Sequence, residues 1–335
     1  MEVYHSIKNK NIAFPKMTKT VSYVDLFCGL GAFHYALDRV RRDDVTYKCV
    51  FACDIDSCVR GIYKSNFGIE PHGDINKINY AAMPDFDMLC AGFPCQSFSK
   101  AGKKEGFADP DRGNLFFKIL EVLDAKRPST VILENVKNLK THDSGRTFAR
   151  ISHELTTRGY NVAHAVLDSR YYSSPQSRCR IYIVATKGAA YTFRNVRNPI
   201  VPVKSILGPE PPKYIDFSKK YALQPCPQKG MMKYTLVNRA TNRGGRQGER
   251  VYSIEHCGPT VCAKSGGPGA KTGLYEIKKD CLRTLSVSET LQMFGFPADI
   301  KREGISTNKM LYYLGNSIVI NVLQEILGDL TWGAA

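Results

Sequence analysis

The sequence predicts an open α/β sheet of the nucleotide-binding kind, followed by a smaller region of loops and short strands. A β-branched and aromatic run ends in a glycine turn at 28–31, and a helical pattern follows it. Short apolar runs then alternate with helical segments up to about residue 190, beyond which proline and glycine replace the helical periodicity. Strands that alternate with helices are typical of a parallel sheet.

Composition and charge favour a nucleic-acid partner. The 335 residues are 43% hydrophobic and carry a formal charge of +16, of which residues 191–285 hold 17 Lys/Arg and 6 Asp/Glu, or +11. Such an excess favours nucleic acid first and an acidic membrane surface second, while a merely solubilising face is the simpler alternative. We see no signal peptide and no apolar run near the roughly 20 residues that span a bilayer.

The 11 cysteines predict free thiols rather than a disulfide framework or a metal site. The closest pairs leave four residues between partners, which is poor spacing for zinc ligands: Cys53/Cys58, Cys90/Cys95 and Cys257/Cys262. We therefore expect a reducing, intracellular compartment and no bound metal.

The first elements predict the opening of a nucleotide-binding unit. Residues 21–27 form an expected strand, 28–31 a glycine turn, and 32–40 a helix. Glycines at such a turn let the backbone approach a ligand at the helix N-terminus. His34 stands where the dinucleotide fingerprint has its third glycine, which argues against a nicotinamide cofactor.

Acidic residues follow the next expected strands. Residues 47–53 predict a second strand that ends at Asp54, about 20 residues past the glycines, where such folds bind ribose hydroxyls. Asp56 fits better as the N-cap of a following helix. Asp74 and Ile75 follow a further possible strand end. We expect these strand ends to converge on one edge, as a site for a ligand with an adenosine part.

The next stretch carries a candidate nucleophile. Residues 86–91 predict a short buried strand, which Gly92 and Pro94 break so that Cys95 lies on the following loop. A cysteine on a loop can serve as a nucleophile, although most free cysteines are simply buried. The polar stretch 100–113 is long for a plain connection, and such loops are usually functional lids or disordered.

Further polar side chains are expected at strand ends. A helix over 114–125 leads to a strand over 130–133 and then to Glu134, for which a solvated loop is the alternative. A helix over 145–158 precedes a strand over 161–168. Arg178 and Arg180 begin another strand and point to one face, because side chains alternate, and so make either an anion site or a solvated edge.

Regular structure resumes near the C-terminus. A helix over 286–294 has Ser286 as its cap and Glu289 three residues on, which is a capping box. Residues 314–317 predict a tight turn, and a last helix follows over 318–330. We expect two domains, one made of 1–190 with 300–335 and the other of 191–299.

Over roughly residues 21–330 the order of these segments closely resembles the cytosine-5 DNA methyltransferase family. The matching motifs are the cofactor glycine motif (25–31), the Pro-Cys-Gln loop (92–99), Glu-Asn-Val (134–136), Gln-x-Arg-x-Arg (176–180) and the last two motifs (283–297 and 315–317). The resemblance implies a Rossmann-like, S-adenosylmethionine-dependent methyltransferase sheet with a smaller target-recognition domain. It also implies methyl transfer to carbon 5 of a cytosine in double-stranded DNA.

The resemblance implies catalytic roles for four residues. Cys95 adds to carbon 6 of the cytosine, which makes carbon 5 reactive toward a sulfonium methyl group. Glu134, kept protonated, supplies a proton or hydrogen bond at ring nitrogen 3. Arg178 and Arg180 hold the cytosine and its sugar-phosphate, and Arg178 favours the thiolate. The base has to flip out of the duplex, with the long polar loop as a lid.

For S-adenosylmethionine the resemblance implies a set of binding residues along the chain. They are Phe27, Gly29 and Gly31 around the methionine part, Asp54 on the ribose, Ile55, Asp74 and Ile75 at the adenine, and Asn316 and Ile318 beside the methionine end. Two positions depart from the family pattern. Ala32 replaces a common glycine, which is tolerable if its φ is negative, and Ile55 replaces a residue that is often aromatic.

Residues 244–253 resemble the recognition loops of the GCGC-modifying (HhaI-type) members of the family. The resemblance implies that Gln247 fills the space of the flipped base and that Arg250 contacts a guanine edge. Arg243 and Arg246 are expected on phosphates, and Gln96, Ser99 and Tyr252 complete the expected DNA contacts. Residues 263–267 and 271–273 are similar to a second recognition loop. A related GC-rich palindrome is the alternative to GCGC.

Three other functions stay open: a catalytically inactive DNA-binding member of the same fold, an RNA-directed cytosine methyltransferase, and a nicotinamide dehydrogenase. The first would lack a nucleophile or an acid, and the last is disfavoured by His34. We expect double-stranded DNA as the partner, no membrane association, a monomer and a cytoplasmic location. A cognate restriction endonuclease would act on the same site without a stable complex.

Overall fold

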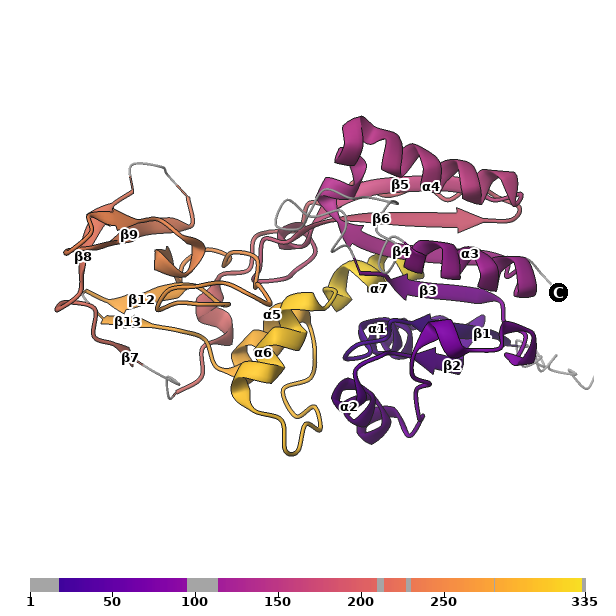
Figure 1. Ribbon diagram of the computed structural model, residues 1–335, viewed down its shortest axis with the longest axis horizontal. Helices are drawn as coiled ribbons and strands as arrows, with labels where there is room; N and C mark the ends of the chain where they lie inside the picture. The colour runs from indigo at the N-terminus through magenta and orange to yellow at the C-terminus, as the bar shows by residue number, and fades with distance from the viewer. Residues whose placement is uncertain (1–17, 95–113, 210–213, 227–229, 280, 333–335) are drawn as a thin grey trace, which may run out of the picture.

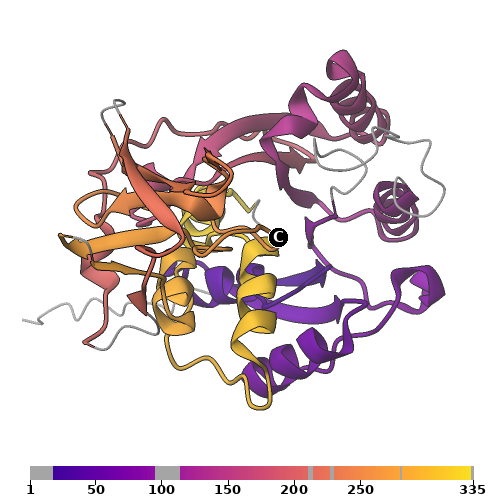
Figure 2. The same cartoon turned by 60° about the vertical axis from the view of Figure 1, so that its left-hand side comes forward.

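Two β-sheets joined through helices make up the part of the chain that the structure describes (Figure 1). The computed structural model describes residues 18–94, 114–209, 214–226, 230–279 and 281–332. Cys95, Gln96, Ser99 and the expected lid at 100–113 therefore lie outside the described residues. Both views place the C-terminal helices α5 (Val287–Phe294) and α6 (Thr307–Asn316) between the two sheets (Figures 1 and 2).

The first sheet has six strands in the order β2-β1-β3-β4-β6-β5. Their bounds are β1 Lys19–Leu26, β2 Val45–Cys53, β3 Met88–Gly92, β4 Thr130–Val136, β5 Asn161–Asp168 and β6 Cys179–Thr186. Strands β1 to β4 are parallel, and β6 runs antiparallel to both of its neighbours. The carboxyl ends of four strands therefore meet at one edge, and the predicted α/β fold class is confirmed.

Alternating side chains build a hydrophobic cluster on each face of this sheet. On β3, Met88 and Cys90 belong to one cluster, and Leu89 and Ala91 belong to the other. Helices α1, α2 and α7 contribute to the first cluster, and α3 and α4 to the second. Their bounds are α1 Ala32–Arg39, α2 Ser57–Phe67, α3 Asn114–Lys126, α4 Arg146–Thr157 and α7 Ile320–Gly328. Strands covered on both faces are typical of parallel sheets.

The second sheet has seven strands, in the order β10-β9-β11-β12-β13-β7 with β8 paired to β9. Their bounds are β7 Tyr214–Ile215, β8 Tyr221–Pro225, β9 Met232–Asn238, β10 Arg243–Gly244, β11 Arg250–Ser253, β12 Leu274–Lys278 and β13 Cys281–Arg283. Its own core is small and centres on Leu236, Val251, Leu274 and Leu282. Because Tyr252 and Tyr275 belong to the large cluster of the first sheet, the two sheets share hydrophobic packing.

Three local expectations differ from the structure. Strand β4 continues through Val136 because β6 pairs with it there, so Glu134 lies within a strand rather than after one. Before Asp74 there is a single bridge, Cys53 to His72, instead of a strand. The expected tight turn at 314–317 is mostly the end of α6, a helix whose final glycine and asparagine resemble turn residues.

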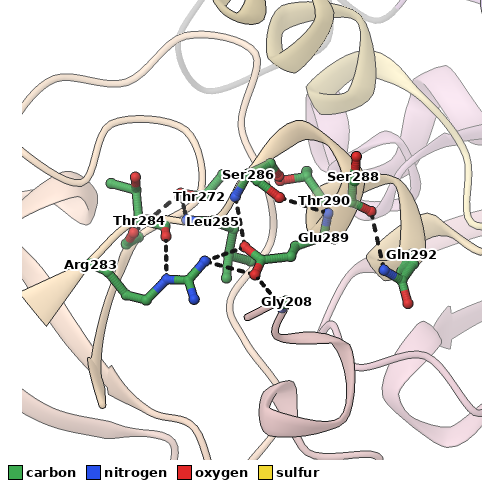
Figure 3. Close-up of polar contacts among 11 residues, drawn as sticks. Gly208, Thr272, Arg283, Thr284, Leu285, Ser286, Ser288, Glu289, Thr290 and Gln292 are labelled. Atoms are coloured by element: carbon green, nitrogen blue, oxygen red, sulfur yellow. Dashed lines mark hydrogen bonds and ion pairs between the residues drawn. The ribbon is translucent and has the colours of Figure 1, made fainter. Parts of the chain in front are cut away.

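A buried ion pair joins the second sheet to α5 (Figure 3). Glu289 accepts hydrogen bonds from Arg283 Nη2 at 2.7 and 2.6 Å, from Ser286 N at 2.8 Å and from Gly208 N at 2.7 Å. Ser286 in turn accepts from Glu289 N, which confirms the predicted capping box. Arg283 and Glu289 are each 3% exposed. The Glu289 carboxylate therefore holds together the end of β13, the start of α5 and the segment that contains Gly208.

We expect the variant Glu289→Gln to lower the free energy of unfolding by about 3 kcal/mol, because it leaves Arg283 buried without a counter-charge. Urea denaturation of the purified protein measures this change. The control is Glu255→Gln, which removes a 62% exposed partner of Lys204 and should change stability by less than about 1 kcal/mol. Equal effects of the two variants would contradict the importance of burial.

Candidate active site

A cavity of about 370 Å³ opens at the carboxyl-end edge of the first sheet. Six segments that are distant in sequence line it: the turn after β1, the loop after β2, the end of β3, the end of β4, the arginines of β6 and the end of α6. Nine of the predicted site residues are among its lining: Phe27, Gly29, Asp54, Ile55, Glu134, Arg178, Arg180, Asn316 and Ile318. The expected convergence on one edge therefore holds for these residues.

The turn after β1 depends on unusual backbone angles. Phe27, Gly29 and Gly31 have φ values of 56°, 52° and 79°, in the left-handed region. A Cβ on Gly31 would lie 2.3 Å from the ring of Phe67 on α2, so only glycine fits there. Gly31 thus shapes the turn without lining the cavity. Ala32 begins α1 and does not have a positive φ, which makes its departure from the family pattern harmless.

The carboxylate of Asp54 is held by two backbone groups. Its Oδ2 accepts from Gly29 N at 3.0 Å and its Oδ1 from Asp56 N at 2.9 Å. Burial raises the pKa of Asp54, while these two hydrogen bonds favour the charged form. Each oxygen keeps a lone pair for a further donor.

The expected adenine side of the cavity is only partly formed. Ile55 is 76% exposed and lines the cavity, so an apolar side chain is available for a ligand. Asp74 and Ile75 do not line it. Asp74 caps a short 3-10 turn by accepting from Asn76 N, and Ile75 is buried in the core.

The donor set of the cavity fits S-adenosylmethionine. Asp54 offers a carboxylate to ribose hydroxyls, Ile55 offers apolar surface to a purine, and the exposed side chain of Asn316 offers an amide to an amino-acid end. When bound, this cofactor would supply a methyl group attached to a positively charged sulfur.

Glu134 is a buried carboxyl at the floor of the cavity. Its side chain extends from β4, the residue is 7% exposed, and Oε1 lies 3.2 Å from Arg180 Nε. Burial raises the pKa of Glu134 above its ordinary value, and the charges of Arg180 and Arg178 limit the rise. A carboxyl of this kind can hold a proton and donate it as a hydrogen bond.

The two arginines have different partners. Arg178 Nη1 donates to Val261 O at 3.0 Å, and Nη2 donates to Gly315 O at 3.0 Å and Ser317 O at 2.8 Å. Its guanidinium therefore joins the first sheet, the second region and the end of α6. The terminal nitrogens of Arg178 thus have backbone partners, whereas its buried Nε has none among the described residues, and the two-arginine anion site stays a prediction. The positively charged guanidinium of Arg180 lies beside Glu134 and lines the cavity.

Asn135 holds the loop that leads toward the candidate nucleophile. Its Nδ2 donates to Phe93 O at 3.1 Å, and its Oδ1 accepts from Val136 N at 2.8 Å. Phe93 and Pro94 line the cavity. Cys95 is the next residue in the chain and lies outside the described residues.

The expected DNA-contacting residues of the second region are placed unequally. Arg243, Arg246 and Arg250 are exposed, although Arg246 is paired with the buried carboxylate of Glu249. Tyr252, by contrast, is 3% exposed and packs against Tyr275 at 6.0 Å between ring centroids. The expectation that Tyr252 contacts DNA is therefore corrected, because its side chain points into the shared core.

Gln247 is half-buried, and its side-chain amide has partners on the second region. Its Nε2 donates to Thr260 O at 2.7 Å, and Cys262 Sγ donates to its Oε1 at 3.1 Å. In this arrangement the amide is turned toward the protein. Filling the space of a flipped base would require these two hydrogen bonds to be exchanged.

Sequence reasoning missed two groups of residues. A second cavity, of about 420 Å³, adjoins Arg180 and is lined by Val136, Lys137, Asn138, Arg170, Ser177, Cys179, Arg180 and Thr260. Tyr312 and Tyr313 of α6 line the first cavity. Neighbouring motifs could have indicated both groups, because Lys137 directly follows Glu-Asn-Val and both tyrosines shortly precede Gly315-Asn316-Ser317.

The described residues contain neither a candidate membrane-spanning helix nor a candidate metal cluster. None of the helices there combines the length and the apolar character that crossing a membrane requires. Within the same residues, no group of three or more His, Cys, Asp or Glu side chains is arranged to hold a metal ion.

The family model described as "C-5 cytosine-specific DNA methylase" matches residues 21–332. The type II methyltransferase M.HhaI of Haemophilus parahaemolyticus is 35% identical over 320 residues, covering 93% of this chain and 94% of its own. M.BsuFI of Bacillus subtilis is 33% identical, covering 97% and 80%. M.HaeII of Haemophilus aegyptius is 47% identical, but only over 50% of each chain.

Solved structures show the same fold at lower sequence identity. The Dnmt2 methyltransferase of S. pombe has a TM-score of 0.69 and 21% identity, and the methyltransferase EhMeth of Entamoeba histolytica has a TM-score of 0.68 and 17% identity. Each comparison covers 92% of this chain and 97% of the other. With the family match and the ordered motifs, the chain belongs to the C-5 cytosine-specific DNA methylase family and is an S-adenosylmethionine-dependent DNA (cytosine-5-)-methyltransferase.

Proposed function

We propose that this enzyme methylates carbon 5 of a flipped-out cytosine in the duplex site GCGC, through a covalent adduct with Cys95. The observation that carries the proposal is Glu134, a buried carboxyl with a raised pKa, in the cavity that also contains the cofactor turn. Phe93 and Pro94, which precede Cys95 in the chain, line the same cavity. A catalytically inactive protein and an RNA-directed enzyme of the same fold are the alternatives.

The chemistry divides one difficult step into easier ones. The Cys95 thiolate gives an electron pair to carbon 6 of the cytosine, and the electrons of the 5,6 double bond become available at carbon 5. Glu134 provides a proton at ring nitrogen 3, which neutralises the charge that the addition creates. After carbon 5 has taken the methyl group, it gives up its proton to solvent and the Cys95 sulfur leaves as a thiolate. The proton on ring nitrogen 3 returns to Glu134, which restores both the aromatic ring and the acid.

The arginines take separate roles in this proposal. Arg180 contacts the cytosine and its sugar-phosphate beside Glu134, whereas Arg178 positions the backbone around the cavity. The second cavity supports a phosphate site for the target strand, because Lys137, Arg170 and Arg180 bring positive charge to it.

We also propose which residues bind the cofactor and which bind DNA. For the cofactor we assign Phe27 and Gly29 to the turn, with Gly31 as its support, Asp54 to the ribose, Ile55 to the adenine, and Asn316 and Ile318 to the methionine end. Asp74 and Ile75 are proposed from the family resemblance alone. For DNA we assign Gln247 and Arg250 to bases and Arg243 and Arg246 to phosphates, with Gln96 and Ser99 from the catalytic loop.

We also propose the organisation and setting of the enzyme. Residues 1–190 with 300–335 form the catalytic domain and 191–299 the recognition domain, which the packing of α7 on α1 supports. The names of the type II relatives support a cognate restriction endonuclease that acts on the same site without a stable complex. A monomer acting on cytoplasmic DNA suffices for a reaction on one strand at a time.

Base-resolution sequencing of DNA from cells that express the protein tests the proposed site. We expect 5-methylcytosine at the first cytosine of GCGC. Methylation of a related GC-rich palindrome would correct the recognition sequence and keep the chemistry. Unmodified DNA together with labelled tRNA would favour the RNA-directed alternative, and no methylation of either would favour the inactive one.

We expect the variant Gly92→Ala to lower kcat roughly tenfold, because small misplacements of reacting groups are costly. A Cβ there would lie 2.9 Å from Ile318 Cδ1 and 3.7 Å from Glu134 Oε2, between the methionine end and the acid. Steady-state methylation of an oligonucleotide duplex measures the effect. The control is Gly61→Ala on α2, where nothing lies within 4 Å and activity should be unchanged. Normal activity of the Gly92 variant would show that the cavity has spare room.

A further inference from the structure

Helix α6 contacts the cofactor side of the cavity through one buried tyrosine. Tyr313 is 7% exposed, and its hydroxyl donates to Asp56 Oδ2 at 2.9 Å. Both residues line the 370 Å³ cavity, although 257 positions separate them in the chain. No family motif quoted above includes either residue.

Asp56 is fixed on both of its carboxylate oxygens. Its Oδ1 caps α2 by accepting from Cys58 N at 2.9 Å and from Val59 N at 3.3 Å, and its Oδ2 accepts from Tyr313. The backbone N–H of Asp56 then donates to Asp54 Oδ1 at 2.9 Å. The orientation of Asp56 therefore determines where the Asp54 carboxylate lies.

The hydrogen bonds that begin at Tyr313 continue to the glycine turn after β1. Asp54 Oδ2 accepts from Gly29 N at 3.0 Å, so an unbroken series of hydrogen bonds runs from α6 to the turn after β1. Burial and the neighbouring Asp56 raise the pKa of Tyr313, which keeps its hydroxyl protonated and able to donate. On the same helix, Lys309 Nζ lies 2.8 Å from Cys58 Sγ, so α6 contacts the start of α2 twice.

We propose that Tyr313 is a positioning residue for S-adenosylmethionine: its hydroxyl holds the Asp54–Asp56 loop in the conformation that presents Asp54 to the ribose hydroxyls. This inference rests on the proposed assignment of Asp54 to the ribose. The C-terminal helix thereby contributes to cofactor affinity through Tyr313, beyond the contacts assigned to Asn316 and Ile318.

The test is calorimetric titration of S-adenosylmethionine into the full chain without DNA. Tyr313→Phe keeps the ring and removes the hydroxyl, and we expect Kd to rise roughly five- to tenfold, as for the loss of a typical intramolecular hydrogen bond. In methylation assays KM for the cofactor should rise by the same factor, while kcat at saturating cofactor and KM for DNA stay unchanged.

A second variant tests whether Tyr313 acts through Asp56. Asp56→Ser retains a good helix cap but removes the oxygen that Tyr313 contacts. It should raise Kd to a similar extent, and adding Tyr313→Phe should then have no further effect. Additive effects of the two changes would overturn the proposed route through Asp56.

A matched control separates positioning from general destabilisation. Tyr160→Phe removes a buried hydroxyl that donates to Pro128 O at 2.7 Å, and neither residue lines the cavity. It should lower stability as Tyr313→Phe does, yet leave Kd unchanged. A Tyr313→Phe protein with Kd within twofold of the original would contradict the inference.

Failure of the proposed function gives a different pattern. A wild-type protein that binds S-adenosylmethionine but methylates no DNA would refute the function and leave the Tyr313 comparison measurable. A variant Asp54→Ala that binds with unchanged Kd would instead remove the ribose assignment, and with it the role proposed for Tyr313.

Discussion

Replacing Glu134 with glutamine lowers kcat for methyl transfer by roughly 10²- to 10⁴-fold, the range in which a positioned proton donor contributes. Glutamine has nearly the same shape, so the cavity keeps its volume and the amide still fits beside Arg180. The amide, however, cannot supply a proton to ring nitrogen 3, and the charge that develops in the cytosine is no longer neutralised. Steady-state kinetics with a duplex oligonucleotide measure this loss.

The same residue predicts how the rate depends on pH. In the proposed role Glu134 acts while it carries its proton, and burial raises the pKa of this carboxyl above its ordinary value. The carboxyl is protonated below this raised pKa and ionised above it, so kcat should fall as the pH rises through it. The decline should be absent in Glu134→Gln, because an amide does not titrate in this range. The control Glu121→Gln, on the outer side of α3 with its side chain 48% exposed, should keep both the rate and the profile. A Glu134→Gln enzyme within tenfold of the original rate would refute the role as an acid.

The parts of the site that local patterns predict are those on strands and tight turns. Short apolar runs predict β1, β3 and β6, and the glycines predict the turn after β1, because each of these signals lies within a few neighbouring residues. Asp54 follows β2, Glu134 lies near the end of β4, and Arg180 lies near the start of β6, which runs antiparallel to β4, so all three reach the same edge of the sheet. For these residues, identifying the strand was enough to place the side chain.

Other features depend on partners that are distant in sequence. Arg178 donates to the carbonyls of Val261, Gly315 and Ser317, which are 83, 137 and 139 positions away. Because every residue has a backbone carbonyl, the sequence does not indicate which ones will accept these hydrogen bonds. Tyr252 is buried because β11 pairs with β12 and brings it beside Tyr275, a register that the sequence of either strand alone does not specify. The alternation at the start of β6 therefore suggested an anion site or a solvated edge for Arg178, and the family resemblance suggested a DNA contact for Tyr252.

Helix α6 shows a third kind of limit. Ser306 caps it and its buried residues include Met310, Leu311 and Leu314, but Gly315 and Asn316 at its end are typical of turns. Gly315 and Asn316 therefore predict a turn, although the apolar residues before them have the spacing of a helix. The sequence therefore does not predict Tyr312 and Tyr313 as cavity residues, although they lie within three positions of the motif that begins at Gly315.

We expect the replacement of Cys95 with alanine to lower the rate of methyl transfer by a factor of roughly 10⁴ or more, because the variant lacks the proposed nucleophile. Without sulfur addition at carbon 6, carbon 5 of the cytosine is too weak a nucleophile to take a methyl group. Asn135 holds the Phe93 carbonyl two residues before Cys95, and Pro94 lines the cavity, so the chain enters the catalytic loop beside Glu134. Transfer of labelled methyl groups to duplex DNA measures the loss.

Covalent trapping shows which atom is attacked and by which residue. DNA with 5-fluorocytosine at the target position, incubated with S-adenosylmethionine, should form a stable adduct with the original protein. After methyl transfer, carbon 5 carries fluorine in place of the proton whose loss would release the Cys95 sulfur. Denaturing electrophoresis detects the adduct, which should be absent with Cys95→Ala. The control Cys226→Ser, a partly buried thiol between β8 and β9, should trap DNA normally. An adduct that forms equally well with Cys95→Ala, or methyl transfer that survives in Cys95→Ser, would remove Cys95 from the mechanism and leave Glu134 as an acid without a nucleophile.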